Sequence, residues 1–347
     1  MVNIVYSLVV WTLFLLISLC GIHYKHADKK EDYFLRLNSF RGIFALEIVI
    51  GHVIRYEATL LYPLGKFMII SVAFFFFVSA FGMVKSFHQK EGYLQGFLTG
   101  KVLYLVMLAI ITFIVNMILD IIYPSDLGYY CPGKNPAAVI VSGTNWYLRE
   151  LLLFYILFYF VYKYIKKFRI LFITLASAVF AGFTFAGGWA QGWYSSILAF
   201  PMGLLFGEYY ETICRFMKTA WGKFITIILI LLGMGSQFLG TDSIIGMVYL
   251  RNAMCIAGML ILIYFCTYFT IGNCVNRILI KYSTEIYLFQ FIYLKIAEDY
   301  GWDFKISLPF VLGCTILTAI IMHPVFGFVR QKLRGVYSQN IAEKQEH

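Results

Sequence analysis

Long apolar stretches alternate with short polar loops along almost the whole chain. A helix needs about 20 mostly apolar residues to cross a bilayer. The pattern therefore predicts an all-α fold, a polytopic transmembrane bundle of about eleven helices. They are expected at about residues 2–22, 40–60, 67–86, 102–123, 145–162, 170–187, 193–208, 223–240, 246–270, 278–297 and 306–328. The loop before the second stretch, residues 23–36, is polar and rich in Lys and Asp.

The basic residues predict the orientation of this bundle in the membrane. Most of the 28 Lys and Arg fall in every second loop. Cytoplasmic loops of membrane proteins carry an excess of Lys and Arg, so this set of loops is expected inside the cell. The bias predicts an N-terminus outside and a C-terminus in the cytoplasm. The first span has no basic residues before it, and we interpret it as a retained helix rather than a signal peptide.

The composition agrees with a membrane protein. Hydrophobic residues make up 61% of the chain and charged residues 13%, and the mean hydropathy is +0.78. A soluble domain has about half apolar and about a quarter charged residues. The net charge of +10 is spread over short loops without a nucleic-acid motif, so we expect membrane lipids but no nucleic acid as partners. None of the seven cysteines forms a CxxC pair, so no metal site is expected.

Arg41 and His52 lie in one apolar stretch with ten residues between them. Eleven helical steps separate them by roughly 16 Å, about half the thickness of a bilayer core. If Arg41 marks the water boundary, His52 lies near mid-membrane with Glu47 between them. Ionisable groups at that depth usually face a protein interior or an aqueous cavity and mark functional sites. The alternative is a buried histidine bonded to a neighbouring helix, with Arg41 as an interfacial anchor.

The segment Asn38–Ala45, followed by Gly51 and His52, resembles the opening motif of the acyltransferase-3 family. These integral membrane enzymes move acyl groups, often acetyl, to envelope carbohydrates and related acceptors. Arg41 and His52 match the family's arginine and the histidine needed for acyl transfer. The resemblance implies an acyl-CoA donor, most simply acetyl-CoA, and no tightly bound cofactor. It also implies an acceptor hydroxyl on an envelope carbohydrate or lipid-linked glycan, and a multi-pass position in the plasma membrane.

The same resemblance implies a domain division. Family members usually have a ten-helix core that starts at the Arg-His helix. Residues 1–36 would then be an added transmembrane helix and cytoplasmic loop. Residues 37–334 would form the acyltransferase-3-like membrane domain, and residues 335–347 a cytoplasmic tail.

Two further segments resemble family motifs near the start of the core. Phe74–Phe81 is similar to an aromatic run that ends in Ser-Gly-Phe, with Ala80 in place of the glycine, although a lipid-facing run would explain the aromatics equally well. Farther along, many relatives carry two arginines three residues apart. Here Lys101 retains a positive charge at the first position, and Tyr104 occupies the second. Any binding of donor phosphates at these positions therefore differs from that in relatives.

Later motifs supply candidate substrate-binding residues. Asn145–Leu152 resembles a Trp-Phe-Leu segment at the outer face, in which Asn145 is expected to cap a helix. Its Trp146 suits the interface, and its Arg149 could either reach an anionic acceptor or pair with an acid on another helix. Ser283–Gln290 resembles a late motif whose usual histidine is replaced by Gln290, while Glu285, Tyr287 and Gln290 itself could bind a hydroxylated acceptor.

We expect donor and acceptor to meet at a cavity around His52. His52 would act as general base, because an unperturbed imidazole titrates near neutrality, and the alternative is a covalent acyl-His intermediate. Glu47 would orient it, and Arg41 would neutralise a donor phosphate. Two alternatives remain: a carrier or flippase for a glycan or small anionic solute, and a non-catalytic sensing module with the same fold. A cavity reaching His52 from the cytoplasm favours the enzyme, and a filled bundle favours the sensing module.

Overall fold

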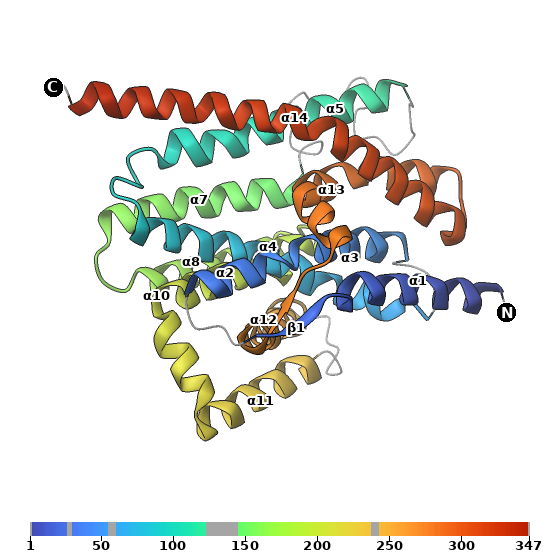
Figure 1. Cartoon of the computed structure of the whole chain (residues 1–347), viewed down its shortest axis with the longest axis horizontal. Helices are drawn as coiled ribbons and strands as arrows, with labels where there is room; N and C mark the ends of the chain where they lie inside the picture. The colour runs from blue at the N-terminus through green and yellow to red at the C-terminus, as the bar shows by residue number, and fades with distance from the viewer. Residues whose placement is uncertain (1, 26–29, 55–59, 123–144, 237–242, 346–347) are drawn as a thin grey trace.

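The computed structural model describes residues 2–25, 30–54, 60–122, 145–236 and 243–345. Within these ranges each predicted apolar stretch is helical over most of its described length, which confirms the all-α bundle (Figure 1). The helices are α1 (Val2–Leu19), α2 (Lys30–Asn38), α3 (Arg41–Val53), α4 (Tyr62–Gln89), α5 (Leu103–Ile122), α7 (Trp146–Tyr164), α8 (Arg169–Ala186), α9 (Gly192–Ser195), α10 (Ala199–Lys218), α11 (Ala220–Gly235), α12 (Arg251–Tyr268), α13 (Cys274–Asp299) and α14 (Phe304–Gln345). Two π-helical turns, η1 (Leu98–Val102) and η3 (Ile245–Leu250), begin α5 and α12.

The structure differs from the expected pattern in the first connecting loop. Part of the predicted polar loop forms α2, because Tyr33 and Leu37 lie one helical turn apart and are both buried against the core. Before it, β1 (Ile22–Tyr24) pairs antiparallel with β2 (Phe269–Ile271). The strands tie the end of α1 to the end of α12, two segments far apart in the sequence (Figure 1).

Two other elements differ in length from the prediction. The stretch expected to cross at 193–208 is divided between the short α9 and α10, which continues to Lys218. Helix α14 does not end at 328 but continues to Gln345, through Pro309 and Pro324. The predicted tail is therefore a helical extension of the last span over its described part.

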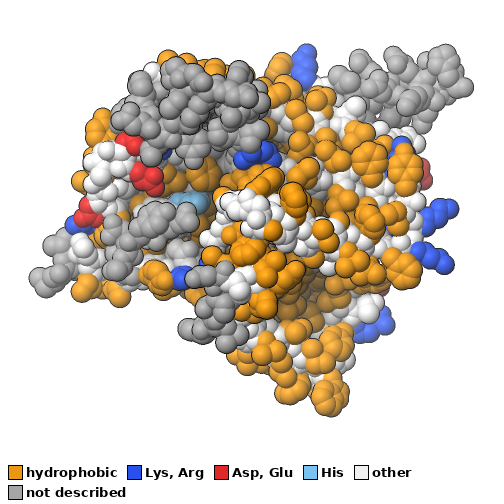
Figure 2. All heavy atoms as spheres, turned by 180° about the vertical axis from the view of Figure 1, so that it is seen from behind, with side chains coloured by type: hydrophobic (Ala, Val, Ile, Leu, Met, Phe, Trp, Pro, Cys, Tyr) orange, Lys and Arg blue, Asp and Glu red, His pale blue; other side chains and the backbone are white. Residues whose placement is uncertain are grey.

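Among the described residues, five helices are by themselves long and apolar enough to cross a membrane. Gly192–Lys218 together with α11, bent by 103°, makes a sixth if the pair counts as one span. Figure 2 shows the face of the molecule that lies behind the view of Figure 1. Hydrophobic side chains cover most of the described surface there, as expected for a multi-pass membrane protein. Several Lys and Arg side chains project at one margin. The two ends of the chain lie at opposite sides of the bundle (Figure 1). Which end is cytoplasmic stays a prediction.

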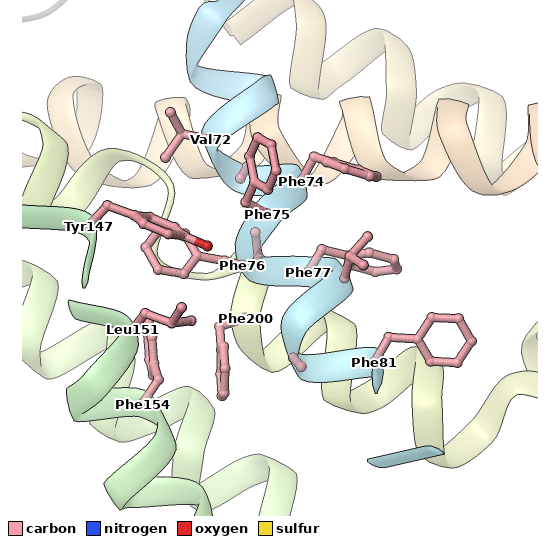
Figure 3. Packing of buried hydrophobic residues seen from close by; sticks show 14 of the residues in the cluster. Val72, Phe74, Phe75, Phe76, Phe77, Phe81, Tyr147, Leu151, Phe154 and Phe200 are labelled. Atoms are coloured by element: carbon pink, nitrogen blue, oxygen red, sulfur yellow. The ribbon is translucent and has the colours of Figure 1, made fainter. Parts of the chain in front are cut away.

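Aromatic side chains fill the centre of the bundle. The consecutive residues Phe74, Phe75, Phe76 and Phe77 on α4 are all buried, so the lipid-facing interpretation of this run is wrong. A helix that is apolar on every side needs protein on every side, and α4 has α3, α10 and α12 around it. Figure 3 shows the rings pointing to different sides of α4. The Phe76 ring lies 4.8 Å from that of Tyr147 on α7.

Small residues let α10 approach α4 closely. A Cβ at Gly203 would lie 2.3 Å from the carbonyl oxygen of Phe77. We therefore expect Gly203→Ala to lower the free energy of unfolding by about 1–3 kcal/mol, as overpacking does. Gly313→Ala on α14 is the matched control, because no heavy atom lies within 4 Å of its added Cβ. The control should be neutral or stabilising by about 0.5–1 kcal/mol. The free energy of unfolding of each variant is measured in detergent. Equal effects of the two substitutions would contradict the close packing of α10 against α4.

Candidate functional site

A cavity of about 290 Å³ lies among α2, α3, α4, η1, α5, α7, α13 and α14. Its polar and charged lining residues are Asn38, Arg41, Ser79, Ser86, Tyr93, Lys101, Tyr104, Tyr147, Tyr155, Thr284, Tyr287 and Arg330. The predicted site residues Arg41, Lys101 and Tyr287 thus meet in one place although they are far apart in the chain. They come from the first turn of α3, from η1 and from the middle of α13.

The cavity is basic. Arg41 and Lys101 share it with Arg330, and none of the described residues that line it is Asp or Glu. The Nε of Arg41 is buried and has no hydrogen-bond partner among the described residues. A cavity lined by these three cations suits an anionic ligand, because guanidinium groups can bind phosphate oxygens in pairs.

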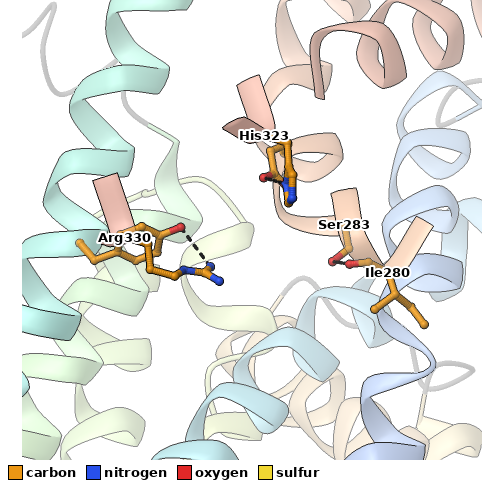
Figure 4. A network of polar contacts seen from close by, with 6 residues as sticks. Ile280, Ser283, His323 and Arg330 are labelled. Carbon is orange, nitrogen blue, oxygen red and sulfur yellow. Dashed lines mark hydrogen bonds and ion pairs between the residues drawn. The ribbon is translucent and has the colours of Figure 1, made fainter. Parts of the chain in front are cut away.

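Arg330 was not predicted as a site residue, because in sequence it is one of many basic residues near a helix end. In the structure it lies over Tyr104, with the guanidinium carbon 5.1 Å from the ring centroid. Its Nη2 also donates a hydrogen bond of 3.2 Å to the Tyr104 hydroxyl (Figure 4). The tyrosine at the position of a family arginine thus holds an arginine from α14. Only the packing of α14 against η1 and α5 reveals this pairing.

Two tyrosines form the wall of this cavity. The rings of Tyr147 and Tyr287 meet edge to face at 4.9 Å, and Phe75 lies 6.0 Å from Tyr287. Tyr147 is placed by the start of α7, where Asn145 Oδ1 accepts a 2.9 Å hydrogen bond from the Tyr147 backbone N–H. The predicted cap at Asn145 is confirmed. The α7 cap therefore sets the position of one side of the site.

His52 lies at the other end of α3, roughly 16 Å from Arg41 along the helix. Its ring is half-buried and meets Phe291 of α13 edge to face at 5.1 Å. His52 is not among the residues that line the basic cavity. The basic cavity is thus centred on the Arg41 end of α3 and not, as the sequence predicts, around His52. A ligand that uses both groups must extend along the helix.

The two acidic residues predicted for the site, Glu47 and Glu285, each contact a polar side chain on another helix. Glu47 is buried on α3 and accepts a hydrogen bond of 2.5 Å from Ser71 Oγ on α4. Glu285 is buried on α13 and lies 2.7 Å from Nδ1 of His323 on α14. His323 was not predicted, since no motif marks it. In Figure 4 this pair lies apart from Arg330. The orienting role of Glu47 toward His52 stays a prediction.

The remaining predicted residues lie outside the basic cavity as well. The side chain of Gln290 is fully buried, and its Nε2 donates to the backbone carbonyl of Tyr287 in its own helix. Trp146 packs against the backbone of Gly192. The guanidinium of Arg149 lies 5.0 Å from the ring centroid of Trp193, which gives it an aromatic partner rather than the acidic one considered from the sequence.

The chemistry open to this arrangement is the binding of an elongated anion beside a histidine-bearing helix. The cations at the Arg41 end can hold phosphates, and the tyrosine hydroxyls can hydrogen-bond neutral parts of the ligand. Among the described residues no group of three or more His, Cys, Asp or Glu side chains is placed to hold a metal ion.

Comparison with known proteins gives one match. A family model described as an acyltransferase domain, that of the acyltransferase-3 family, matches residues 34–325. The matched range begins in α2 and ends in α14, so it includes every element that lines the basic cavity except the last part of α14 with Arg330. No curated protein and no solved structure shows significant similarity to the chain.

The pair of Glu285 and His323 should contribute to stability. His323→Leu leaves a buried carboxyl without its partner and should lower the free energy of unfolding by about 1–3 kcal/mol. Glu285→Gln together with His323→Leu should cost less than the sum of the single changes, with a coupling energy of about 0.5–3 kcal/mol. Unfolding of the four proteins in detergent measures this cycle. Strictly additive effects would show that the two side chains do not interact.

Proposed function

The chain belongs to the acyltransferase-3 family, and on this premise we propose that it transfers an acetyl group from acetyl-CoA to a hydroxyl of a cell-envelope carbohydrate or lipid-linked glycan in the plasma membrane. The observation that carries this proposal is the basic cavity, lined by Arg41, Lys101 and Arg330, at one end of the helix that bears His52. Acetyl-CoA is an elongated anion, with phosphates at one end and the thioester at the other, so only its phosphate end needs to lie in this cavity of about 290 Å³.

In this proposal the donor phosphates bind at Arg41, Lys101 and Arg330. The unpartnered Nε of Arg41 supplies a hydrogen bond that no described protein group uses. Arg330 supplies a planar guanidinium that Tyr104 holds in place, which offsets the missing second arginine at that position. The thioester end would then extend along α3 toward His52.

His52 is proposed as the general base of the reaction. It takes the proton from the acceptor hydroxyl as the oxygen attacks the thioester carbonyl. The carbon–sulfur bond then breaks, and coenzyme A leaves as a thiol after it receives that proton. The products are an ester on the acceptor and free coenzyme A, so one proton is moved and none is lost.

One observation favours the non-catalytic alternative. Gln290 occupies the position of a family histidine, and its amide is bonded within its own helix and cannot move a proton. A sensing module would bind acyl-CoA in the same cavity without transferring the acyl group. Measurement of transfer, rather than of binding, separates the two functions.

His52→Ala should reduce acetyl transfer by about 10²–10⁴-fold, the usual contribution of a general base. The assay uses the full chain in lipid with radiolabelled acetyl-CoA and co-purified envelope glycan. His88→Ala is the matched control, because His88 lies 2.7 Å from Glu208 and is not in the cavity lining. Unchanged transfer by His52→Ala would remove His52 from the mechanism, and donor binding without transfer by the wild type would favour the sensing module.

Arg41→Gln should raise the KM for acetyl-CoA by about tenfold or more, since a hydrogen bond to a charged group is worth about 1.5–3 kcal/mol. Arg330→Gln should raise it less, by about two- to fivefold, because Arg330 is solvent-exposed. Both effects should shrink at high salt. Steady-state kinetics with varied acetyl-CoA measures them, with Lys332→Gln, a basic change outside the cavity lining, as control. A KM that none of the changes alters would place the donor elsewhere.

A further inference from the structure

Helix α7 separates two cavities. One of its faces, with Tyr147, Leu148, Leu151 and Tyr155, lines the basic cavity. The other face lines a second cavity of about 250 Å³ between α7 and α8. The lining of this second cavity consists of Glu150, Leu153, Phe154, Leu157, Ala176, Ser177, Phe180 and Ile197. We call it the Glu150 cavity.

Glu150 is the only ionisable residue among the described residues that line this cavity. Its side chain is 1% exposed, and neither carboxyl oxygen has a hydrogen-bond partner among the described residues. The one other polar side chain, Ser177, already donates its hydroxyl to the backbone carbonyl of Ile173 at 2.7 Å. Buried polar groups are almost always hydrogen-bonded, and burial of a carboxyl group without a hydrogen-bond partner in an apolar site costs free energy. A ligand that bonds to Glu150 would remove this cost.

The surroundings indicate that such a ligand comes from the bilayer. Leu153 at the cavity is 49% exposed, and Val179 on the outer face of α8 is 73% exposed. Helix α8 is one of the helices apolar and long enough to cross a membrane. In the membrane its exposed apolar face contacts lipid tails, so a molecule dissolved among those tails can reach the space between α7 and α8.

The chemistry of the cavity selects a neutral ligand with a hydroxyl group. Burial of an isolated carboxyl group in apolar surroundings costs less free energy for the neutral acid than for the carboxylate. The neutral acid both donates and accepts a hydrogen bond. A hydroxyl group also donates and accepts, so the two are complementary. The other lining side chains offer contact to a hydrocarbon chain. The volume is below the roughly 300–1,000 Å³ of common ligand pockets, which favours a slender molecule.

We propose that the Glu150 cavity binds a membrane-dissolved alcohol, with its hydroxyl on the Glu150 carboxyl and its hydrocarbon chain between Leu157 and Phe180. The site is on the opposite face of α7 from the basic cavity. The proposal therefore stands whether or not the basic cavity binds acetyl-CoA.

The test uses the full chain in lipid nanodiscs and a diazirine derivative of octanol as photoreactive probe. Wild-type protein should show saturable labelling that unlabelled octanol competes away, with the label on peptides of α7 and α8. Glu150→Leu should weaken binding by about tenfold or more, because both hydrogen bonds are lost. Glu150→Gln should retain most of it, since an amide still donates and accepts.

A second pair of variants keeps the test valid if Glu150→Leu does not fold. Ala176→Phe should block the cavity and abolish saturable labelling, whereas Val179→Phe adds a ring on the exposed face of the same helix and should leave labelling unchanged. Size-exclusion profiles confirm that each variant is folded. Absence of saturable labelling in the wild type, or equal labelling of wild type and Ala176→Phe, would overturn the proposal. Stronger competition by octylammonium than by octanol, lost in Glu150→Gln, would overturn it in favour of an ionised carboxylate that binds a cation.

Discussion

The constraint on which the structure depends is that α3 carries ionisable groups and is too short to cross a bilayer alone. Its thirteen residues span about 20 Å, whereas the hydrocarbon core is about 30 Å thick. Nine of these residues are buried, because α4, α13 and α14 enclose the helix. Gly42 allows this closeness, since a Cβ there would lie 2.6 Å from the Cβ of Leu279 on α13. The enclosure buries Glu47 and leaves Arg41 and His52 half-buried.

The phenylalanine run of α4 supports this enclosure from the other side. Because its rings point to several sides of the helix, α4 fixes α7 and α10 as well as α3 (Figure 3). Phe154 of α7 stacks on Phe200 of α10 at 4.2 Å, which completes the packing around Phe76. The position of Tyr147 in the basic cavity follows from the same contacts. Core packing and site geometry therefore share residues, and a change in one alters the other.

The two faces of α7 have different surroundings, which explains why adjacent residues differ in role. Tyr147 and Leu151 face the basic cavity, Arg149 lies against Trp193, and Glu150 faces the space beside α8. Residues one apart on a helix point in directions about 100° apart, so Arg149 and Glu150 do not form a pair. One wall can thus serve an anionic ligand on one side and a lipid-dissolved ligand on the other.

The sequence by itself determined the class of fold, the approximate place of each long helix, the cap at Asn145 and the family, because hydrophobic segments and local motifs depend on residues close together in the chain. It also singled out Arg41 and Lys101. Only the tertiary structure decided that Arg330 joins them, that His323 pairs with Glu285, and that Glu150 faces a cavity without a partner. Each of these depends on how α14 or α8 packs against helices far away in sequence, and periodicity within one helix does not specify its neighbour.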